Sequence, residues 1–150
     1  MTWTQQAKLL AEDDAASKFF GYSVAIDGDT VVVGTYGGSV YVFARTGTTW
    51  SQQAKLVAKD GSKNIRFGRS VAIGGDTIVV GAVGNDDNGP WSGSAYIFNR
   101  SGITWTERAK MVANDGVADA FYGGSVAIDN GTIVVGAVGD ATENGEDSGS

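Results

Sequence analysis

The chain repeats itself three times, and this repetition constrains its fold more than any other feature. The segments "WTQQAKLLAEDD", "WSQQAKLVAKDG" and "WTERAKMVANDG" begin at Trp3, Trp50 and Trp105, so that successive copies lie 47 and then 55 residues apart. From the tryptophan onward, the first two copies agree at roughly 20 of 32 aligned positions. Repeats of this length are typical of solenoids, propellers and arrays.

Each copy contains four predicted β-strands. Residues 21–26 end at Asp27-Gly28, and the third copy has Asn130-Gly131 at the same place. Both dipeptides favour a tight hairpin turn, because glycine and asparagine adopt positive φ. The next strand, residues 30–34, is continuously apolar, as expected for a central strand that is covered on both faces. Residues 39–45 form the predicted third strand.

The fourth strand, "WSQQAKLV", combines apolar and polar residues. Strict alternation predicts one face made of Trp50, Gln52, Ala54 and Leu56 and another made of Ser51, Gln53 and Lys55. A polar row of this kind suits an outer strand, because glutamine and lysine discourage pairing with a further strand.

Four short antiparallel strands in about 50 residues are typical of a β-propeller blade. We therefore expect an all-β chain whose residues 1–150 form a single portion of a propeller, with repeats at approximately 3–49, 50–104 and 105–150. The 23 glycines support many tight turns, and the two-residue periodicity excludes helical repeats.

The third repeat is expected to be incomplete. The first blade should span residues 20–57 and the second residues 67–112, but the third has only "YGGSVAI" and "TIVVGAV" before the final "DSGS", where an "AYIF" strand should begin. Propellers close with about four to eight blades. Either the chain is part of a longer propeller, or copies associate to complete the ring, six blades from a dimer being the simplest count. Unpaired edge strands favour such a homo-oligomer.

Composition excludes several classes of function. Without cysteine or histidine, the chain lacks thiolate nucleophiles and the commonest general base. A net charge of −6 opposes binding to nucleic acid, and no apolar run is long enough for membrane insertion. The first residues, "MTWTQQAKLL", do not form a signal peptide.

The repeats resemble the FG-GAP repeats of the integrin α-subunit propeller and of many bacterial surface proteins. The Phe-Gly element appears at Phe20-Gly21 and Phe67-Gly68, with Tyr122-Gly123 as a variant. The Gly-Ala-Pro element appears with valine in place of proline at Gly81-Ala82-Val83 and Gly136-Ala137-Val138, while Gly34-Thr35-Tyr36 matches least. The resemblance implies a propeller that serves as a scaffold or adhesion surface outside the cell.

Many repeats of that family bind calcium between the first two strands. Here the corresponding segments, such as "AIDGDTVV", are too short to surround an ion that needs six to eight oxygen ligands. We therefore expect no cofactor and no metal at that place.

Two long loops, residues 84–94 and 139–150, differ between the copies and hold the candidate ligand-binding residues. These residues are Asp86, Asp87, Trp91, Asp140, Glu143 and Asp147. Solvated acidic loops are the favoured interpretation, with calcium binding as the alternative. Trp91 has no counterpart in the first copy, so it is either an anchor for a protein or a glycan or a side chain that folds back on its own blade.

Two further series recur in every repeat. The three tryptophans are expected to pack between neighbouring blades. The aspartates Asp13, Asp60 and Asp115 are expected to cap turns by accepting backbone N–H groups, with ligand binding at one rim as the alternative.

The favoured function is a non-enzymatic scaffold for protein interaction or adhesion, which assembles through its blades. A glycan- or calcium-binding propeller that uses the rim loops is one alternative, and an engineered or amplified repeat without a ligand is another. Paired carboxylates could in principle support a glycosidase, but no constellation outside the two loops departs from the repeat, as a catalytic site normally does.

Overall fold

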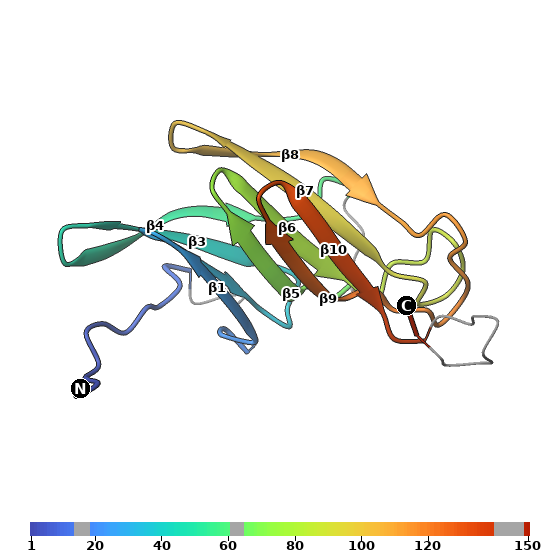
Figure 1. Cartoon of the computed structure of the whole chain (residues 1–150), viewed down its shortest axis with the longest axis horizontal. Coiled ribbons are helices and arrows are strands. Elements are labelled where there is room, and N and C mark those ends of the chain that lie inside the picture. Colours follow the sequence, from blue (N-terminus) through green and yellow to red (C-terminus); the bar gives the residue numbers. More distant parts are fainter. Residues whose placement is uncertain (14–18, 61–64, 140–148) are drawn as a thin grey trace.

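The computed structural model describes residues 1–13, 19–60, 65–139, 149 and 150, and within them every regular element is a β-strand (Figure 1). The ten strands are β1 (Ser23–Asp27), β2 (Thr30–Gly34), β3 (Val40–Thr46), β4 (Thr49–Leu56), β5 (Phe67–Gly74), β6 (Thr77–Ala82), β7 (Ser94–Ser101), β8 (Thr104–Met111), β9 (Tyr122–Asp129) and β10 (Thr132–Ala137). They form antiparallel sheets in the orders β1-β2-β3-β4, β5-β6-β7-β8 and β9-β10. The predicted all-β propeller blades, with a third that is incomplete, are confirmed.

The three blades pack side by side through their first strands. Strand β5 packs against β1 on one side and against β9 on the other, so the first strand of every blade lies innermost (Figure 1). The second strand of each complete blade lies between the first and the third, as its apolar sequence predicts. Val32 of β2 and Val79 of β6 are fully buried, because each strand has a sheet neighbour on both sides and the next blade covers the face on which the valine lies.

The prediction for the faces of the fourth strand is wrong. Val42 pairs with Ala54 while Phe43 pairs with Gln52, so Gln53 is an extra residue in β4. A β-bulge reverses the alternation of side chains beyond it. Lys55 therefore pairs with Tyr41 on the face that carries Trp50. Ala54 and Leu56 lie on the opposite face.

The main core lies between the first and second blades. Val32, Val40, Val42 and Leu56 of the first blade belong to one buried cluster with Phe67, Ile78, Val80, Tyr96, Phe98 and Trp105 of the second. A second cluster joins Ala72, Val79 and Ala95 of the second blade to the third. The second blade therefore contributes its two faces to two different neighbours.

The segment before β1 covers the free face of the first blade in part. Leu9 and Ala11 pack against a cluster of Val33, Tyr41 and Phe43. The backbone N–H of Glu12 donates a hydrogen bond to Gln52, just as the N–H of Lys59 donates to Glu107 in the next blade. Residues 9–13 thus contact the first blade as residues 56–60 contact the second.

Ser150 pairs with the last residue of the second strand of the third blade. The N–H of Ser150 donates to the carbonyl of Ala137, and the N–H of Ala137 donates to the carbonyl of Ser150. Ser94 pairs with Ala82 in the same way at the start of β7. Ser150 is therefore the register equivalent of Ser94, which opens the predicted "AYIF" strand.

Candidate functional site

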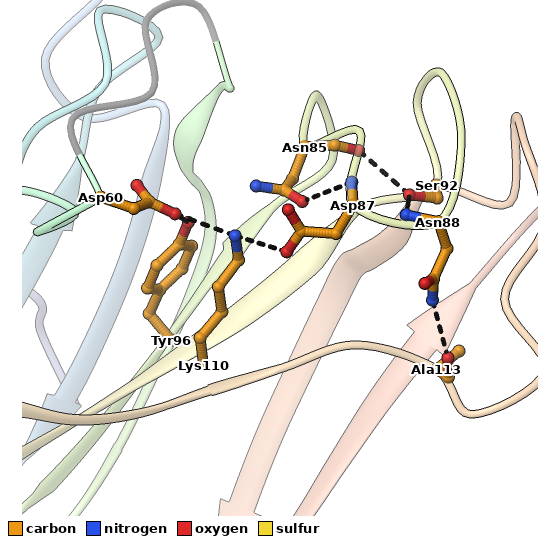
Figure 2. A network of polar contacts seen from close by, with 8 residues as sticks. All are labelled: Asp60, Asn85, Asp87, Asn88, Ser92, Tyr96, Lys110 and Ala113. Atoms are coloured by element: carbon orange, nitrogen blue, oxygen red, sulfur yellow. Dashed lines mark hydrogen bonds and ion pairs between the residues drawn. The ribbon is translucent and has the colours of Figure 1, made fainter.

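A polar cluster at the edge of the second blade brings together residues from three segments (Figure 2). The hydroxyl of Tyr96 on β7 donates to Asp60, 2.7 Å away, and Nζ of Lys110 on β8 lies 2.8 Å from the same oxygen. Lys110 also pairs with Asp87 at 2.6 Å. One ammonium group therefore joins the loop before β5 to the long loop after β6.

The same Asp–Tyr–Lys arrangement recurs at the first blade. Asp13 accepts a hydrogen bond from the hydroxyl of Tyr41 at 2.7 Å and another from Lys55. The carboxylate of Asp13 therefore binds side chains of the following blade. The turn cap expected for Asp13 stays a prediction, because residues 14–18, which follow it, lie outside the described residues. Asp115, the third member of the series, is exposed and makes no hydrogen bond with any residue in the described parts of the chain.

Burial and hydrogen bonding change the titration of the cluster at the second blade. Burial, and then the hydrogen bond to Asp60, raise the pKa of Tyr96 to about 12. Burial opposes the charge on Lys110, but its hydrogen bonds to Asp60 and Asp87 outweigh that effect, so the pKa of Lys110 is raised above its ordinary value. Tyr96 therefore stays protonated and Lys110 stays charged at neutral pH. The cluster is a stable hydrogen-bonded joint, not an acid–base pair near neutrality.

The long loop between β6 and β7 is ordered by its own polar side chains (Figure 2). Asn85 is buried, and its amide oxygen accepts from the N–H of Asp87 at 3.0 Å. The hydroxyl of Ser92 accepts from the N–H of Asn88 at 3.1 Å, and the amide of Asn88 donates to the carbonyl of Ala113. Asp86 accepts from the N–H of Trp91 at 2.8 Å. The two adjacent aspartates thus hold the loop and Lys110 in place.

This loop also braces the second blade against the third. The carbonyls of Pro90, Trp91 and Ser92 accept hydrogen bonds from the backbone N–H groups of Asp119, Phe121 and Tyr122, at 2.8, 3.0 and 2.9 Å. Gly93, with φ of 84°, lies so close to Tyr122 that a Cβ atom would be 2.1 Å from its carbonyl oxygen. The insertion is therefore a connector between blades.

Trp91 folds back onto the propeller. Its ring lies 4.6 Å from the guanidinium carbon of Arg66 and 6.2 Å from the ring of Phe121, and its side chain is half-buried. The guanidinium of Arg66 also lies 5.2 Å from the ring of Tyr36 in the first blade. The sequence analysis did not select Arg66. The sequence does contain a signal for it: Arg66 departs from the repeat, because the residue before the Phe-Gly element is phenylalanine in the other two copies.

A family model described as the FG-GAP repeat matches residues 3–43, 50–98 and 105–150. The chain belongs to the FG-GAP repeat family. Members of this family form β-propeller modules that are generally non-catalytic and typical of extracellular proteins. The search of curated protein sequences found no significant match to the chain. Among the described residues, no helix is long and apolar enough to cross a membrane.

The structure gives a physical reason for the glycines of the FG-GAP motif. Gly68 of the Phe-Gly element has φ of 93°, which favours glycine, and it packs against Ser39 and Val40 of the first blade. A Cβ on Gly34, the last residue of β2, would lie 2.3 Å from the carbonyl oxygen of Gly68. That carbonyl also accepts the hydroxyl of Ser23 at 2.8 Å. The two motif glycines therefore let neighbouring blades approach each other at the centre.

The same contact joins the second and third blades. The hydroxyl of Ser70 donates to the carbonyl of Gly123 at 2.8 Å, and a Cβ on Gly81 would lie 2.0 Å from that oxygen. The FG-GAP element is thus a repeated blade-to-blade joint.

The calcium alternative gains no support from the described carboxylates. Within the described ranges, no group of three or more Asp or Glu residues could hold a metal ion. Asp86 and Asp87 are engaged with Trp91 and Lys110, and Asp27 in the first hairpin accepts from the N–H of Gly75 at 2.7 Å. The other predicted site residues, Asp140, Glu143 and Asp147, lie outside the described residues.

Proposed function

We propose that this chain is a non-enzymatic interaction scaffold that acts outside the cell and that docks further propeller blades onto its two open faces. A second copy of the chain is the partner that we propose for those faces. The proposal depends on one comparison, between residues that occupy equivalent positions in different blades.

Equivalent residues are buried where a neighbouring blade is present and exposed where it is absent. Val71 and Ile73 of β5 are each 8% exposed, because the first blade packs against them. Their equivalents in β1, Val24 and Ile26, are 67% and 64% exposed. The inner part of the first blade thus presents an apolar face that elsewhere in the chain is an interface.

The third blade has the complementary open face. Val134 of β10 is 62% exposed, whereas its equivalents Val32 and Val79 are fully buried between blades. Exposed apolar faces of this kind mark surfaces for association. The two open faces differ, so head-to-tail contact between copies is the geometry that reuses the existing blade interface.

Light scattering over a series of protein concentrations tests the proposal. We expect wild-type protein to have a mass that is a multiple of the 15.5 kDa chain. Val24→Glu places a charge on the open face of the first blade, and Val134→Glu places one on the open face of the third blade. Both positions are exposed, so neither variant puts a charge into the core, and each should shift the mass toward 15.5 kDa.

Ile103→Glu is the matched control, because Ile103 is 76% exposed in the outer hairpin between β7 and β8 and lies on neither open face. This variant should associate as the wild type does. A wild-type mass of 15.5 kDa at every concentration would refute self-association. Equal loss of association in all three variants would show that the contact does not involve the open faces.

A further inference from the structure

A continuous row of arginine and aromatic side chains runs across all three blades at the rim where the first strands begin. The row consists of Tyr22, Tyr36, Arg66, Arg69, Trp91 and Phe121. The guanidinium of Arg69 lies 5.2 Å from the ring of Tyr22, and the rings of Tyr22 and Tyr36 are 5.7 Å apart. Arg66 then lies between Tyr36 and Trp91, and Trp91 contacts Phe121. We call these six residues the arginine–aromatic row.

The arginines of this row are not required by the repeat. Phe19, Arg66 and Phe121 occupy the same position before the glycine motif, with φ of 57°, 52° and 54°. The backbone at this position is therefore the same with phenylalanine as with arginine. Arg69 likewise corresponds to Tyr22 and Gly124. A departure from the repeat that the scaffold does not need is a sign of a specific role.

Among the residues that the structure describes, neither guanidinium group of the row has an acidic partner. Arg45 and Arg100, which recur in the repeat, pair with Asp29 and Asp76. Arg66 and Arg69 contact aromatic rings, and neither side chain makes an ion pair or hydrogen bond with any residue in the described part of the chain.

The stacking prepares Arg66 to bind a carboxylate. Rings of Tyr36 and Trp91 contact its guanidinium, so the side chain is held before any ligand arrives. The N–H groups of a guanidinium lie in its plane and match the two oxygens of a carboxylate. Fixing the donor in advance lowers the entropy lost on binding.

The composition of the row matches the central residues of protein interfaces. Tyrosine, tryptophan and arginine dominate such interfaces, while lysine and acidic residues are depleted there. Tyr22 and Tyr36 are 41% and 39% exposed, so both rings offer surface to a partner. The charge of the two arginines is complementary to an acidic ligand, whereas the rest of the chain, with a net charge of −6, repels one and so confines it to the row.

We propose that the arginine–aromatic row binds an acidic peptide segment of a partner protein. Carboxylates of the segment pair with Arg66 and Arg69, and its apolar groups pack on Tyr22 and Tyr36. None of the six residues of the row is among the exposed valines and isoleucine that define the open faces, so the proposal goes beyond assembly of the scaffold. Its failure would leave the self-association result unaffected.

Fluorescence anisotropy with a fluorescein-labelled hexaglutamate peptide at low ionic strength tests the proposal. A hexaglutamine peptide reports binding that does not depend on charge. Arg66→Gln and Arg69→Gln should each weaken hexaglutamate binding about tenfold or more, because each removes a charge-assisted hydrogen bond. Arg66→Lys should also weaken it, since lysine lacks the planar pair of donors.

Arg108→Gln is the matched control, because Arg108 is an exposed arginine on β8 outside the row. It removes the same charge and should leave hexaglutamate binding unchanged. Circular dichroism melting of every variant verifies folding, and Arg69→Gln alone suffices for the test if Arg66→Gln fails to fold.

Three results would overturn the proposal. Hexaglutamate that does not bind wild-type protein is the first, and equal weakening by Arg108→Gln is the second. The third is arginine-dependent binding of polygalacturonate without binding of hexaglutamate, which would make the ligand an acidic polysaccharide.

Discussion

The indole Nε1 of Trp105 donates a hydrogen bond to the side-chain oxygen of Gln53, 2.9 Å away, across the boundary between the second and first blades. Gln53 is the extra residue at the bulge in β4, and Trp105 is only 9% exposed. The tryptophan at the start of one repeat thus forms a hydrogen bond with the bulge residue of the preceding repeat. This contact joins two blades at Trp105, as predicted. The same prediction is wrong for Trp3, which is 89% exposed and therefore does not pack between blades.

Two substitutions of Trp105 should destabilise the protein to different extents. Trp105→Phe removes the hydrogen bond and should lower the free energy of unfolding by about 1 kcal/mol. Trp105→Ala also leaves a cavity and should lower it by about 3–5 kcal/mol. Urea unfolding measures both values. Trp3 is 89% exposed, so Trp3→Ala should change the free energy by less than about 0.5 kcal/mol. Equal losses at Trp3 and Trp105 would contradict the assignment.

Local sequence patterns predicted the blades well, because their determinants are short-range. The hairpin glycines and the continuous apolar run at residues 30–34 led to the correct strand order, and the predicted strand at residues 30–34 is β2. The bulge at Gln53 could not be read in the same way. It depends on pairing with β3 and on contact with Trp105, neither of which leaves a local periodicity.

The candidate site was less predictable, because its contacts join distant repeats. Asp86 and Asp87 were selected as acidic residues, but their partners are a backbone N–H within the loop and a lysine on β8. Arg66 meets Trp91 only because the loop after β6 turns back toward the rim. A comparison of repeats that also examined the position before each Phe-Gly element would have selected Arg66.

Removal of the Tyr96 hydroxyl should weaken the joint at the second blade. Tyr96→Phe should lower the free energy of unfolding at pH 7 by about 1.5–3 kcal/mol, because the hydroxyl donates to the charged carboxylate of Asp60. Urea unfolding of the variant measures this. Tyr22→Phe is the control, since Tyr22 is 41% exposed and its ring contacts do not require the hydroxyl. A loss of similar size in both variants would argue against the cluster.

The same tyrosine should make stability depend on alkaline pH. Burial and the hydrogen bond to Asp60 raise the pKa of Tyr96 to about 12, whereas an unfolded tyrosine titrates near 10. The folded state holds this proton more tightly, so the contribution is complete below pH 10 and is lost as the pH rises from 10 towards 12. The raised pKa of Lys110 acts in the same direction. Urea midpoints should fall more steeply across this range in wild-type protein than in Tyr96→Phe, and parallel curves would contradict the expectation.

Gly81→Ala should separate the second and third blades. The new Cβ would lie 2.0 Å from the carbonyl oxygen and 2.9 Å from the carbonyl carbon of Gly123, which are backbone atoms that cannot rotate away. It would also lie 2.3 Å from the hydroxyl oxygen of Ser70. We expect a loss of at least about 2 kcal/mol in unfolding free energy. Gly74→Ala is the matched control, because its Cβ would meet only the side chain of Ile128 at 3.3 Å. That variant should stay within about 1 kcal/mol of wild type. Equal stability of the two variants would refute a close approach at Gly81.

Asp13→Asn should release the segment before β1 from the first blade. Hydrogen bonds from Lys55, and then from Tyr41, hold the pKa of Asp13 below its ordinary value of 3.8. The carboxylate therefore stabilises the docked segment above pH 3.8, and this contribution is lost as the pH falls through the lowered folded pKa. At neutral pH the variant lacks the charge altogether, so residues 9–13 should exchange their backbone hydrogens faster than in wild-type protein.

Hydrogen exchange followed by mass spectrometry of the peptide that contains residues 9–13 measures this release. Asp29→Asn is the control, because it removes an exposed carboxylate that pairs with Arg45 within the first blade and does not contact the segment. Exchange in the control should match wild type. Unchanged exchange in Asp13→Asn would show that the segment is held without Asp13, by the apolar packing of Leu9 and Ala11 and by the hydrogen bond from Glu12 to Gln52.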